Sequence, residues 1–326
     1  MASGLDLSFS EDQQAISAAV HRFCLQHDSE ATARRSGGQL PRELWQKLAA
    51  LGVFSPAAPG MEGAGGALEI CAISEALGHN VFPGPVAATF LAIQVLTAEE
   101  SAALIDGRAL VSLSNAGNTL LPWGLDADIF LVADESRIYR AGAPPSVTSV
   151  DTLGGEPWGR GTLEIEAELD GAMRGLITGN IARAAYLASA GLRLVTDASN
   201  YATTRKQFGK PLGDFQAVTQ PLADCAIAVT AAQTLARAAA CHFDSFLSGR
   251  SASLRQADIY AAGAAFSASR AALKSAFVCH QVFAGIGITL EGPVYHISRR
   301  IRQLASQAPG HSAEQELLLA QIGLGV

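Results

Sequence analysis

The stretch from residue 201 to residue 216 combines residue types that could bind a phosphorylated aromatic ligand. Arg205 and Lys206 bring positive charge to the end of a predicted helix, where the helix dipole favours cations. Two glycines and a proline then break the helix and expose backbone N–H groups. A cation, free amides and the rings of Phe208 and Phe215 on one turn suit a dinucleotide. The alternative is a plain helix end whose loop is held in place by the two Phe residues.

The composition is that of a soluble protein with room for two or three domains. The chain has 326 residues, of which 49% are hydrophobic and 16% charged, and its net charge is -7. Because the chain is acidic and has no large basic patch, we expect no nucleic-acid partner. No uninterrupted apolar run is long enough to cross a bilayer, and the first residues do not resemble a signal peptide. We therefore predict a cytoplasmic protein without membrane insertion.

The cysteines are odd in number and far apart, and most lie in apolar helical stretches. This usage predicts small buried hydrophobic residues in a reducing compartment, with neither disulfides nor a metal site. The residues are Cys24, Cys71, Cys225, Cys241 and Cys279.

The pattern of the whole chain predicts a mainly α protein with a small β domain. An N-terminal helical domain spans residues 1–105, a reduced middle β domain spans 106–170, and a C-terminal four-helix bundle spans 171–326. Ser10, with Gln13 three positions later, predicts a capping box at the start of the first helix. The predicted strands are 109–114, 129–133, 138–140 and 162–167, with a hairpin turn at 134–136.

Long apolar stripes organise the C-terminal part. Between Val218 and Phe243 the apolar residues alternate at spacings of four and three, which is typical of a bundle seam. Small residues between Ala257 and Ser275 repeat the pattern and allow helices to approach closely. Such a stripe indicates a core rather than a cofactor site.

Two motifs together resemble the acyl-CoA dehydrogenase family, and the resemblance covers nearly the whole chain. The first is the run Arg-Lys-Gln-Phe-Gly-Lys-Pro at 205–211, with Tyr201 before it and Phe215-Gln216 after it. The second is Gln-Val-Phe-Ala-Gly-Ile-Gly at 281–287, followed by Glu-Gly-Pro-Val at 291–294 and Arg299-Arg300. Residues 9–13 and 41–45 are similar to the helical N-terminal domain of that family.

The resemblance implies FAD, bound across a subunit interface. Arg205 would face the diphosphate, with Gln207 and Phe208 beside the ribityl and adenine portion. Gln281 and Gly285 would meet the diphosphate of the neighbouring subunit's flavin. The chemistry fits, because Arg offers a planar, permanently charged donor fork for phosphate and Gly lets backbone approach a ligand closely.

Gln216 is a further flavin-binding candidate, and the alternative is a cap for the helix that begins near Asp214. Ala284 replaces a glycine that is usual in the family.

Members of the family oxidise an acyl-CoA thioester at its α and β carbons, and a Glu near the substrate removes the α proton. By family spacing, this Glu falls on Ala308 or Pro309, or in some members on Gly179, which Asn180 follows. The chain has no carboxylate at these positions, so its catalytic residues stay unassigned.

Three ionisable residues lie a few positions after Ala308 and Pro309. Glu314 and Glu316 are expected in the first turn of a terminal helix, where acids are ordinary partners of the helix dipole. His311 could act as a base at neutral pH, and the alternative is a solvent-facing loop residue.

A short chain, a trimmed β domain and a missing Glu resemble the smaller subunits of two-gene acyl-CoA dehydrogenases, some of which act on steroid side-chain CoA thioesters. The implied partners are an acyl-CoA thioester and either further copies of the chain or a full-length sister subunit, with electron-transfer flavoprotein as acceptor if the chain is active. A binding and assembly subunit without turnover and a flavin monooxygenase on the same fold are the alternatives.

Overall fold

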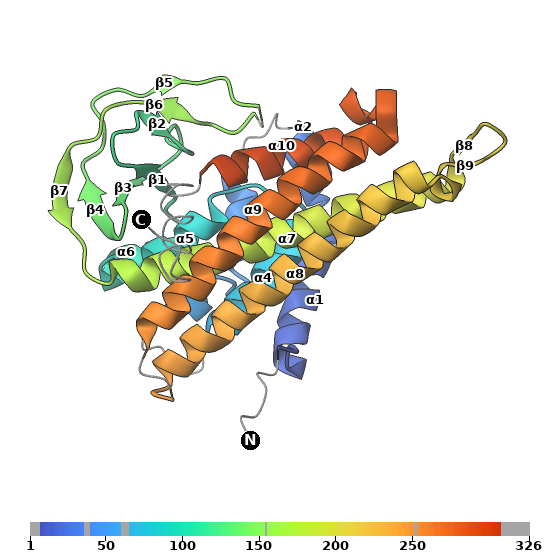
Figure 1. Ribbon diagram of the computed structural model, residues 1–326. Coiled ribbons are helices and arrows are strands. Elements are labelled where there is room, and N and C mark those ends of the chain that lie inside the picture. The colour runs from blue at the N-terminus through green and yellow to red at the C-terminus, as the bar shows by residue number, and fades with distance from the viewer. Residues whose placement is uncertain (1–6, 36–39, 60–64, 154, 251–252, 308–326) are drawn as a thin grey trace, which may run out of the picture.

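The computed structural model describes residues 7–35, 40–59, 65–153, 155–250 and 253–307. Figure 1 shows long helices running side by side through the molecule, with the strands of the β region gathered at one side and the N-terminal helices behind. The sequence-based fold class, helical domains at both ends around a small β region, is confirmed.

The N-terminal helices are short, apart from the first. Its Ser10 side chain accepts from the Gln13 N–H while the Gln13 side chain accepts from the Ser10 N–H, which is the predicted capping box. At the start of the fourth helix the Glu69 side chain accepts from the Gly66 N–H, and Asp244 adds a cap by accepting from the N–H groups of Ala67 and Leu68. The elements are α1 (Glu11–Gln26), α2 (Ser29–Arg35), α3 (Arg42–Ala49), η1 (Ser55–Ala57), α4 (Ala67–His79), α5 (Val86–Ile93) and α6 (Ala98–Ile105).

The β region forms two small sheets, with strand orders β1-β3-β4-β7 and β2-β6-β5. The predicted hairpin joins β3 to β4, and its turn residue Glu135 has φ +48. The predicted strand at 162–167 starts later, at Ile165. Three two-residue strands, β2, β5 and β6, are too short to leave a pattern in the sequence. The strands are β1 (Val111–Asn115), β2 (Leu120–Leu121), β3 (Ile129–Asp134), β4 (Arg137–Ala141), β5 (Thr148–Ser149), β6 (Gly159–Arg160) and β7 (Ile165–Glu168).

The C-terminal bundle packs along the predicted seams. Every predicted seam residue from Leu222 to Phe243 is buried, and Val218 at the exposed end is half-buried. The small residues from Ala257 to Ser275 are buried as well, since they face the neighbouring helices. The elements are α7 (Ala172–Thr204), β8 (Lys206–Gln207), β9 (Lys210–Pro211), η2 (Leu212–Asp214), α8 (Gln216–Leu247), α9 (Leu254–Phe283), η3 (Ala284–Ile288) and α10 (Pro293–Ser306).

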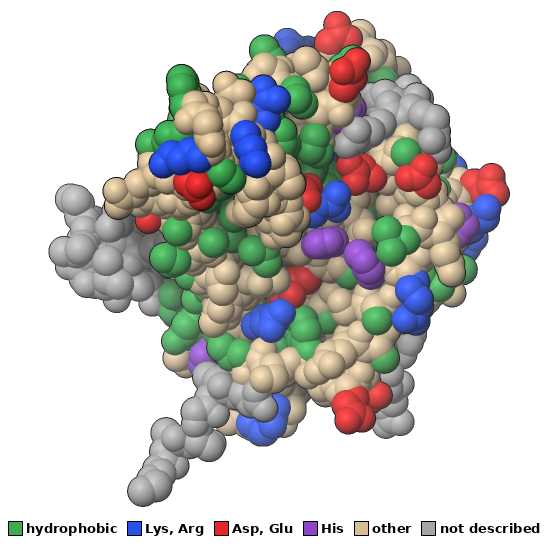
Figure 2. Space-filling model, turned by 90° about the vertical axis from the view of Figure 1, so that its right-hand side faces the viewer, with side chains coloured by type: hydrophobic (Ala, Val, Ile, Leu, Met, Phe, Trp, Pro, Cys, Tyr) green, Lys and Arg blue, Asp and Glu red, His purple; other side chains and the backbone are tan. Residues whose placement is uncertain are grey.

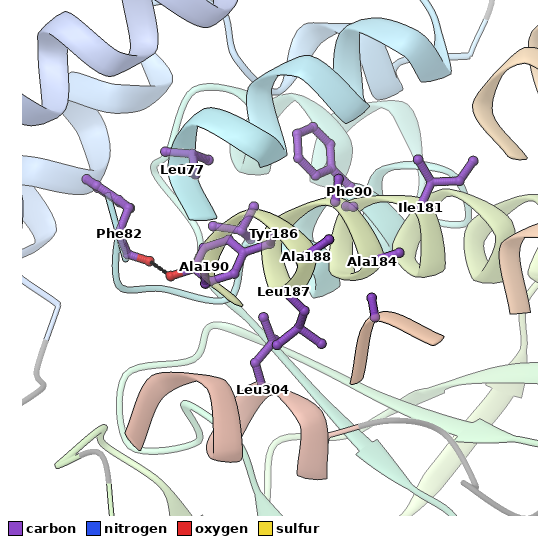
Figure 3. Packing of buried hydrophobic residues seen from close by; sticks show 14 of the residues in the cluster. Leu77, Phe82, Phe90, Ile181, Ala184, Tyr186, Leu187, Ala188, Ala190 and Leu304 are labelled. Atoms are coloured by element: carbon purple, nitrogen blue, oxygen red, sulfur yellow. Dashed lines mark hydrogen bonds between the residues drawn. The ribbon is translucent and has the colours of Figure 1, made fainter. Parts of the chain in front are cut away.

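Helices α4 and α7 approach each other closely. A Cβ on Gly78 would lie 2.2 Å from the backbone O of Tyr186, so only glycine fits there. Nearby, the Tyr186 hydroxyl donates to the backbone O of Phe82 at 2.7 Å (Figure 3). The same figure shows Phe90, Ile181 and other buried side chains packed around α7, so this helix lies at the centre of the core.

A buried arginine joins the three parts of the chain. Arg300 of α10 donates from Nη2 to the backbone O of Gly84 at 2.6 Å and from Nε to the Tyr186 hydroxyl at 3.3 Å. Its Nη1 forms an ion pair with Glu156, and the two side chains are 7% and 3% exposed. Its guanidinium carbon also lies 5.7 Å from the ring centre of Trp123. Burial lowers the pKa of Arg300 to about 9, so the side chain is still charged at neutral pH.

One segment of the described chain, Leu254–Ile288, is long and apolar enough to cross a membrane by length and composition. In the structure it comprises α9 and η3, and α9 packs against α7 and α8 in the bundle. A core helix of a bundle meets the same criterion, so the absence of membrane insertion stays a prediction. All five cysteines are free and buried, as predicted.

Candidate functional site

The first motif forms a hairpin that projects from the end of the bundle, at the upper right of Figure 1. Helix α7 ends at Thr204, and Arg205 is extended, with its N–H bonded to the Tyr201 O at 2.9 Å. Strands β8 and β9 then pair across Phe208 and Gly209, whose φ values are +52 and +83. Two positive φ values in a two-residue turn are typical of tight hairpins, although an aromatic residue rarely adopts one.

Phe208 is 93% exposed, and its ring contacts the ring of Phe215 edge-on, with the ring centres 6.2 Å apart. Phe215 also contacts Lys210, whose Nζ lies 4.3 Å from its ring centre. Gln216 is the first residue of α8 and is exposed. The helix has Phe215 at its N-cap without a side-chain hydrogen bond, so the suggested capping role of Gln216 is wrong.

The second motif forms the end of α9 and the turn η3. Ala284 has φ +50, a region that favours glycine, which gives a physical reason why glycine is usual at this point. Gly285 follows, and a Cβ built on it would meet no atom within 4 Å. The backbone of Gly285 is therefore open to a ligand. His280, one residue before the motif, turns away to hydrogen-bond Ser298 at 2.7 Å, and burial lowers its pKa.

One cavity of about 770 Å³ brings the two motifs together. Arg205 and Gln207 line it from the hairpin, and Gln281 and Gly285 line it from α9 and η3. Of the six predicted flavin-binding residues, these four share the cavity, whereas Phe208 and Gln216 do not line it. The remaining lining residues are Tyr201, Leu212, Ala217, Val218, Pro221, Phe277, Val278, Val282, Phe283, Ala284 and Ile286.

The cavity has the chemistry of a nucleotide site. The rings of Tyr201 and Phe283 stack at 4.6 Å and form an aromatic wall that joins the two motifs. Arg205 provides a positive charge and two glutamines provide amide donors and acceptors. Figure 2 looks onto this end of the molecule and shows basic side chains in its upper part beside hydrophobic ones. The volume lies within the range of known small-molecule sites, so the cavity can accept part of a dinucleotide.

Phe277 is a lining residue that the motifs did not indicate. It lies one helical turn before Gln281 on α9 and is 71% exposed. The spacing of four between the two residues places them on one face of the helix, and this signal could have identified Phe277.

A second, smaller cavity of about 40 Å³ lies where α5, β1, α7 and α10 meet. Gly179 and Asn180 line it from α7 and Gln307 lines it from the end of α10. Gly179 is one of the positions at which the family resemblance places the catalytic Glu. Space is tight: a Cβ on Gly179 would lie 3.0 Å from the Leu91 Cβ.

The described lining of this smaller cavity contains no carboxylate. Ala308 and Pro309 themselves lie outside the described residues, as do His311, Glu314 and Glu316. Within the described part of the chain, no group of three or more His, Cys, Asp and Glu residues could hold a metal ion.

Comparison with known protein families shows to which family the chain belongs. The model of the acyl-CoA dehydrogenase N-terminal domain matches residues 10–102, and that of the acyl-CoA dehydrogenase C-terminal domain matches residues 169–321. The chain belongs to the acyl-CoA dehydrogenase family. Acyl-CoA dehydrogenase FadE27 of Mycobacterium tuberculosis (strain ATCC 25618 / H37Rv) is 31% identical, over 78% of this chain and 81% of that protein.

Solved structures of acyl-CoA dehydrogenases share the fold. A chain of the ChsE4-ChsE5 complex from Mycobacterium tuberculosis superposes with a TM-score of 0.79 at 25% identity, over 98% of each chain. A chain of the Tcur3481-Tcur3483 steroid ACAD superposes with a TM-score of 0.78 at 20% identity, over 96% of this chain and 98% of that one. The family and this fold both imply FAD.

The residues of the larger cavity fit part of an FAD. The open backbone at Gly285, the Arg205 guanidinium and the stacked rings of Tyr201 and Phe283 match a diphosphate beside an aromatic base. The smaller cavity does not fit the flavin ring system together with a thioester, because its volume of about 40 Å³ holds only a few waters.

Proposed function

We propose that this acyl-CoA dehydrogenase chain is a short subunit that shares an FAD with a full-length sister subunit across their interface. The complex would carry out α,β-dehydrogenation of an acyl-CoA thioester. The observation that carries the proposal is the cavity in which Arg205, Gln207, Gln281 and Gly285 meet. That cavity offers contacts for the diphosphate and adenine portion, while the chemistry would lie in the sister subunit.

The smaller cavity supports this division of roles. Its described lining contains no carboxylate, with glycine at position 179, and it is too small for the reacting groups. FAD accepts the hydride when it is bound in such a complex. The contribution of this chain is to hold the cofactor through Arg205 and the two glutamines, and to complete the site at the interface.

The names of the structural relatives also support a heteromer and its substrate class. One is a complex of two different subunits, and another is named a steroid ACAD. We therefore expect a bulky acyl-CoA, such as a steroid side-chain thioester, to be the substrate, with electron-transfer flavoprotein as the acceptor. The cytoplasmic location stays a prediction.

The test is to purify the chain alone and together with a full-length sister, and to record the visible spectrum of each under anaerobic conditions with acyl-CoA added. Flavin in the complex that bleaches with substrate, and a colourless chain alone, would support the proposal. Bleaching by the chain alone would refute the need for a sister. Oxygen consumption with product hydroxylation would favour the monooxygenase alternative.

A second candidate function, a binding and assembly subunit without a role in FAD retention, is separated by one substitution. Arg205→Ala should weaken FAD retention in the complex by about 1.5–3 kcal/mol, the value of a charge-assisted hydrogen bond. Lys206→Ala is the matched control, since Lys206 is the next residue and does not line the cavity. Equal FAD affinity in both variants and in the unchanged complex would favour the assembly subunit.

A further inference from the structure

The larger cavity has a polar end and an apolar end. The four predicted flavin-binding residues that line it form the polar end, and the shared-FAD proposal uses only these. The apolar end lies further from the hairpin along α8 and α9, and no role has been assigned to it. The residues of the apolar end are Ala217, Val218 and Pro221 of α8 and Phe277 and Val278 of α9. The described lining of the whole cavity contains no Asp or Glu, so a ligand with phosphate groups meets no like charge there.

Phe277 is the exposed aromatic ring of this apolar end. Its side chain is 71% exposed, and it makes no ring stacking or cation contact with the residues that the structure describes. The rings of Tyr201 and Phe283 each cover one face of the other, because they stack at 4.6 Å. A flat aromatic ligand removes the most apolar area from water where a ring face is still uncovered. Phe277 therefore offers the open ring face of the cavity.

The spacing of residues along α9 fits a base that is joined to phosphate groups through a sugar. Phe277 and Gln281 are four residues apart, so they lie on one face of the helix, about 6 Å apart along its axis. This separation leaves room for a ribose between a phosphate at Gln281 and a base at Phe277. A ligand that fills both ends of the cavity is therefore a nucleotide.

A proline in α8 leaves a hydrogen-bond acceptor at the apolar end. Pro221 lies inside the helix and has no N–H, so the backbone O of Ala217, four residues earlier, lacks its usual intrahelical donor. Both residues line the cavity. Adenine carries an amino group at C6, which can donate to this carbonyl, whereas guanine and hypoxanthine carry an oxygen there. An oxygen at C6 would place two acceptors against each other, so the carbonyl favours adenine.

We propose that the apolar end binds adenine, with the base stacked on Phe277 and its amino group donating to the backbone O of Ala217. The chain alone then recognises the adenosine diphosphate unit of the cofactor and does not require the flavin ring. This inference rests on the proposed sharing of FAD, which supplies the ligand. It assigns the choice of base to Phe277, Ala217 and Pro221, which lie outside the two sequence motifs.

The test is isothermal titration calorimetry on the purified full chain, after removal of any flavin, with ADP, inosine diphosphate, pyrophosphate and FMN. ADP should bind saturably. Inosine diphosphate has an oxygen in place of the amino group and should bind about tenfold more weakly. FMN has no adenine and should bind no more tightly than pyrophosphate. FAD and coenzyme A both contain an adenosine diphosphate unit, so both are titrated as well, and FAD should bind more tightly than coenzyme A.

Four variants separate the two ends of the cavity. Phe277→Ala should weaken ADP binding about tenfold, as expected for the loss of one base-stacking contact, and should leave pyrophosphate binding unchanged. Phe277→Tyr keeps the ring and should keep the affinity for ADP. Ile227→Ala is the matched control, since Ile227 is also 71% exposed and does not line the cavity. Pro221→Ala restores a donor for the Ala217 O and should reduce the preference for ADP over inosine diphosphate to about twofold.

Several outcomes would overturn the proposal. They are the absence of saturable ADP binding, equal affinities for ADP and inosine diphosphate, an unchanged ADP affinity in Phe277→Ala, and tighter binding of coenzyme A than of FAD. A failure of the shared-FAD proposal is recognised separately, because Arg205→Ala would then leave FAD retention in the complex unchanged. If FAD retention depends on Arg205 while Phe277→Ala leaves ADP binding unchanged, only the assignment of the adenine site is wrong.

Discussion

Replacing Glu156 by Gln should destabilise the folded chain far more than the loss of an ordinary surface ion pair. Glu156 and Arg300 are 3% and 7% exposed, so the substitution leaves a buried cation without its counter-charge. At an ordinary ion-pair separation of about 2.8 Å and an effective dielectric constant of about 20, the lost attraction is about 6 kcal/mol. Since Gln keeps a hydrogen bond to the guanidinium, we expect a cost of about 3–5 kcal/mol.

The change in melting temperature follows from chain length. For 326 residues the unfolding entropy corresponds to about 1.5 °C per kcal/mol, so Glu156→Gln should lower Tm by about 4–7 °C. Differential scanning calorimetry and urea denaturation measure both quantities. Asp106→Asn is the matched control, because Asp106 pairs with Arg108 at 3.0 Å with both side chains more than half exposed. That pair should contribute less than about 1 kcal/mol.

The reasoning about the buried pair would be refuted if Glu156→Gln cost no more than Asp106→Asn. Such a result would mean that water reaches Arg300 in the folded chain. A double substitution, Glu156→Leu with Arg300→Met, should recover most of the lost stability, because it removes both charges and fills the space with apolar groups.

Three further predictions concern the core and its titrating groups. Gly78→Ala should cost about 1–3 kcal/mol, because the new Cβ would lie 2.2 Å from the Tyr186 O; an unchanged urea midpoint would contradict this close packing. Burial, with a smaller effect of Arg193, lowers the pKa of His79 below its ordinary value of 6.5. The unfolded chain therefore binds a proton on His79 more tightly than the folded chain does. The stabilisation that comes from burying neutral His79 is complete above pH 6.5 and is lost as pH falls towards the lowered pKa. His79→Gln should flatten the pH dependence of stability in that window, and an unchanged slope would exclude His79 as its source. Burial raises the pKa of Cys279 to about 12, so a thiol reagent at pH 8 should label this residue only after unfolding, and rapid labelling of the native chain would show that the thiol is accessible.

The bundle could be predicted from the sequence because its signals are local and periodic. Alternating spacings from Val218 to Phe243 mark the buried face of one helix without any knowledge of its neighbours. The hairpin at Glu135 was predictable for the same reason, since polar turn residues separate two apolar runs. The two-residue strands could not be predicted, because two residues are too few to show an alternating pattern.

The candidate site was predicted in part. Arg205 and Gln281 lie far apart in the sequence, and only the family resemblance suggested that both bind a flavin. The structure places them in one cavity. Phe208 was expected beside the ligand, and it occupies the tip of a tight turn, where it is 93% exposed and its ring contacts Phe215. Its role in flavin binding stays a prediction.

The junction around Arg300 could not be predicted at all. Its partners, Gly84, Glu156 and Tyr186, belong to three regions of the sequence with no shared periodicity. An isolated Arg or Glu is most often at the surface, so composition indicates nothing about such a pair. The same holds for the smaller cavity, whose lining residues are assembled from four elements.

The alanine-rich seams have a consequence for how the bundle is stabilised. Alanine has no rotamer freedom to lose on folding, so the contact between α8 and α9 forms without the side-chain entropy cost that Leu or Met would carry. Each alanine also buries little apolar area, so stability is distributed over helices of 32 and 30 residues rather than concentrated in a few large side chains. The backbones must stay close along the whole length, since dispersion falls off steeply with distance. In such a bundle, shortening a helix is more damaging than trimming any one of its seam residues.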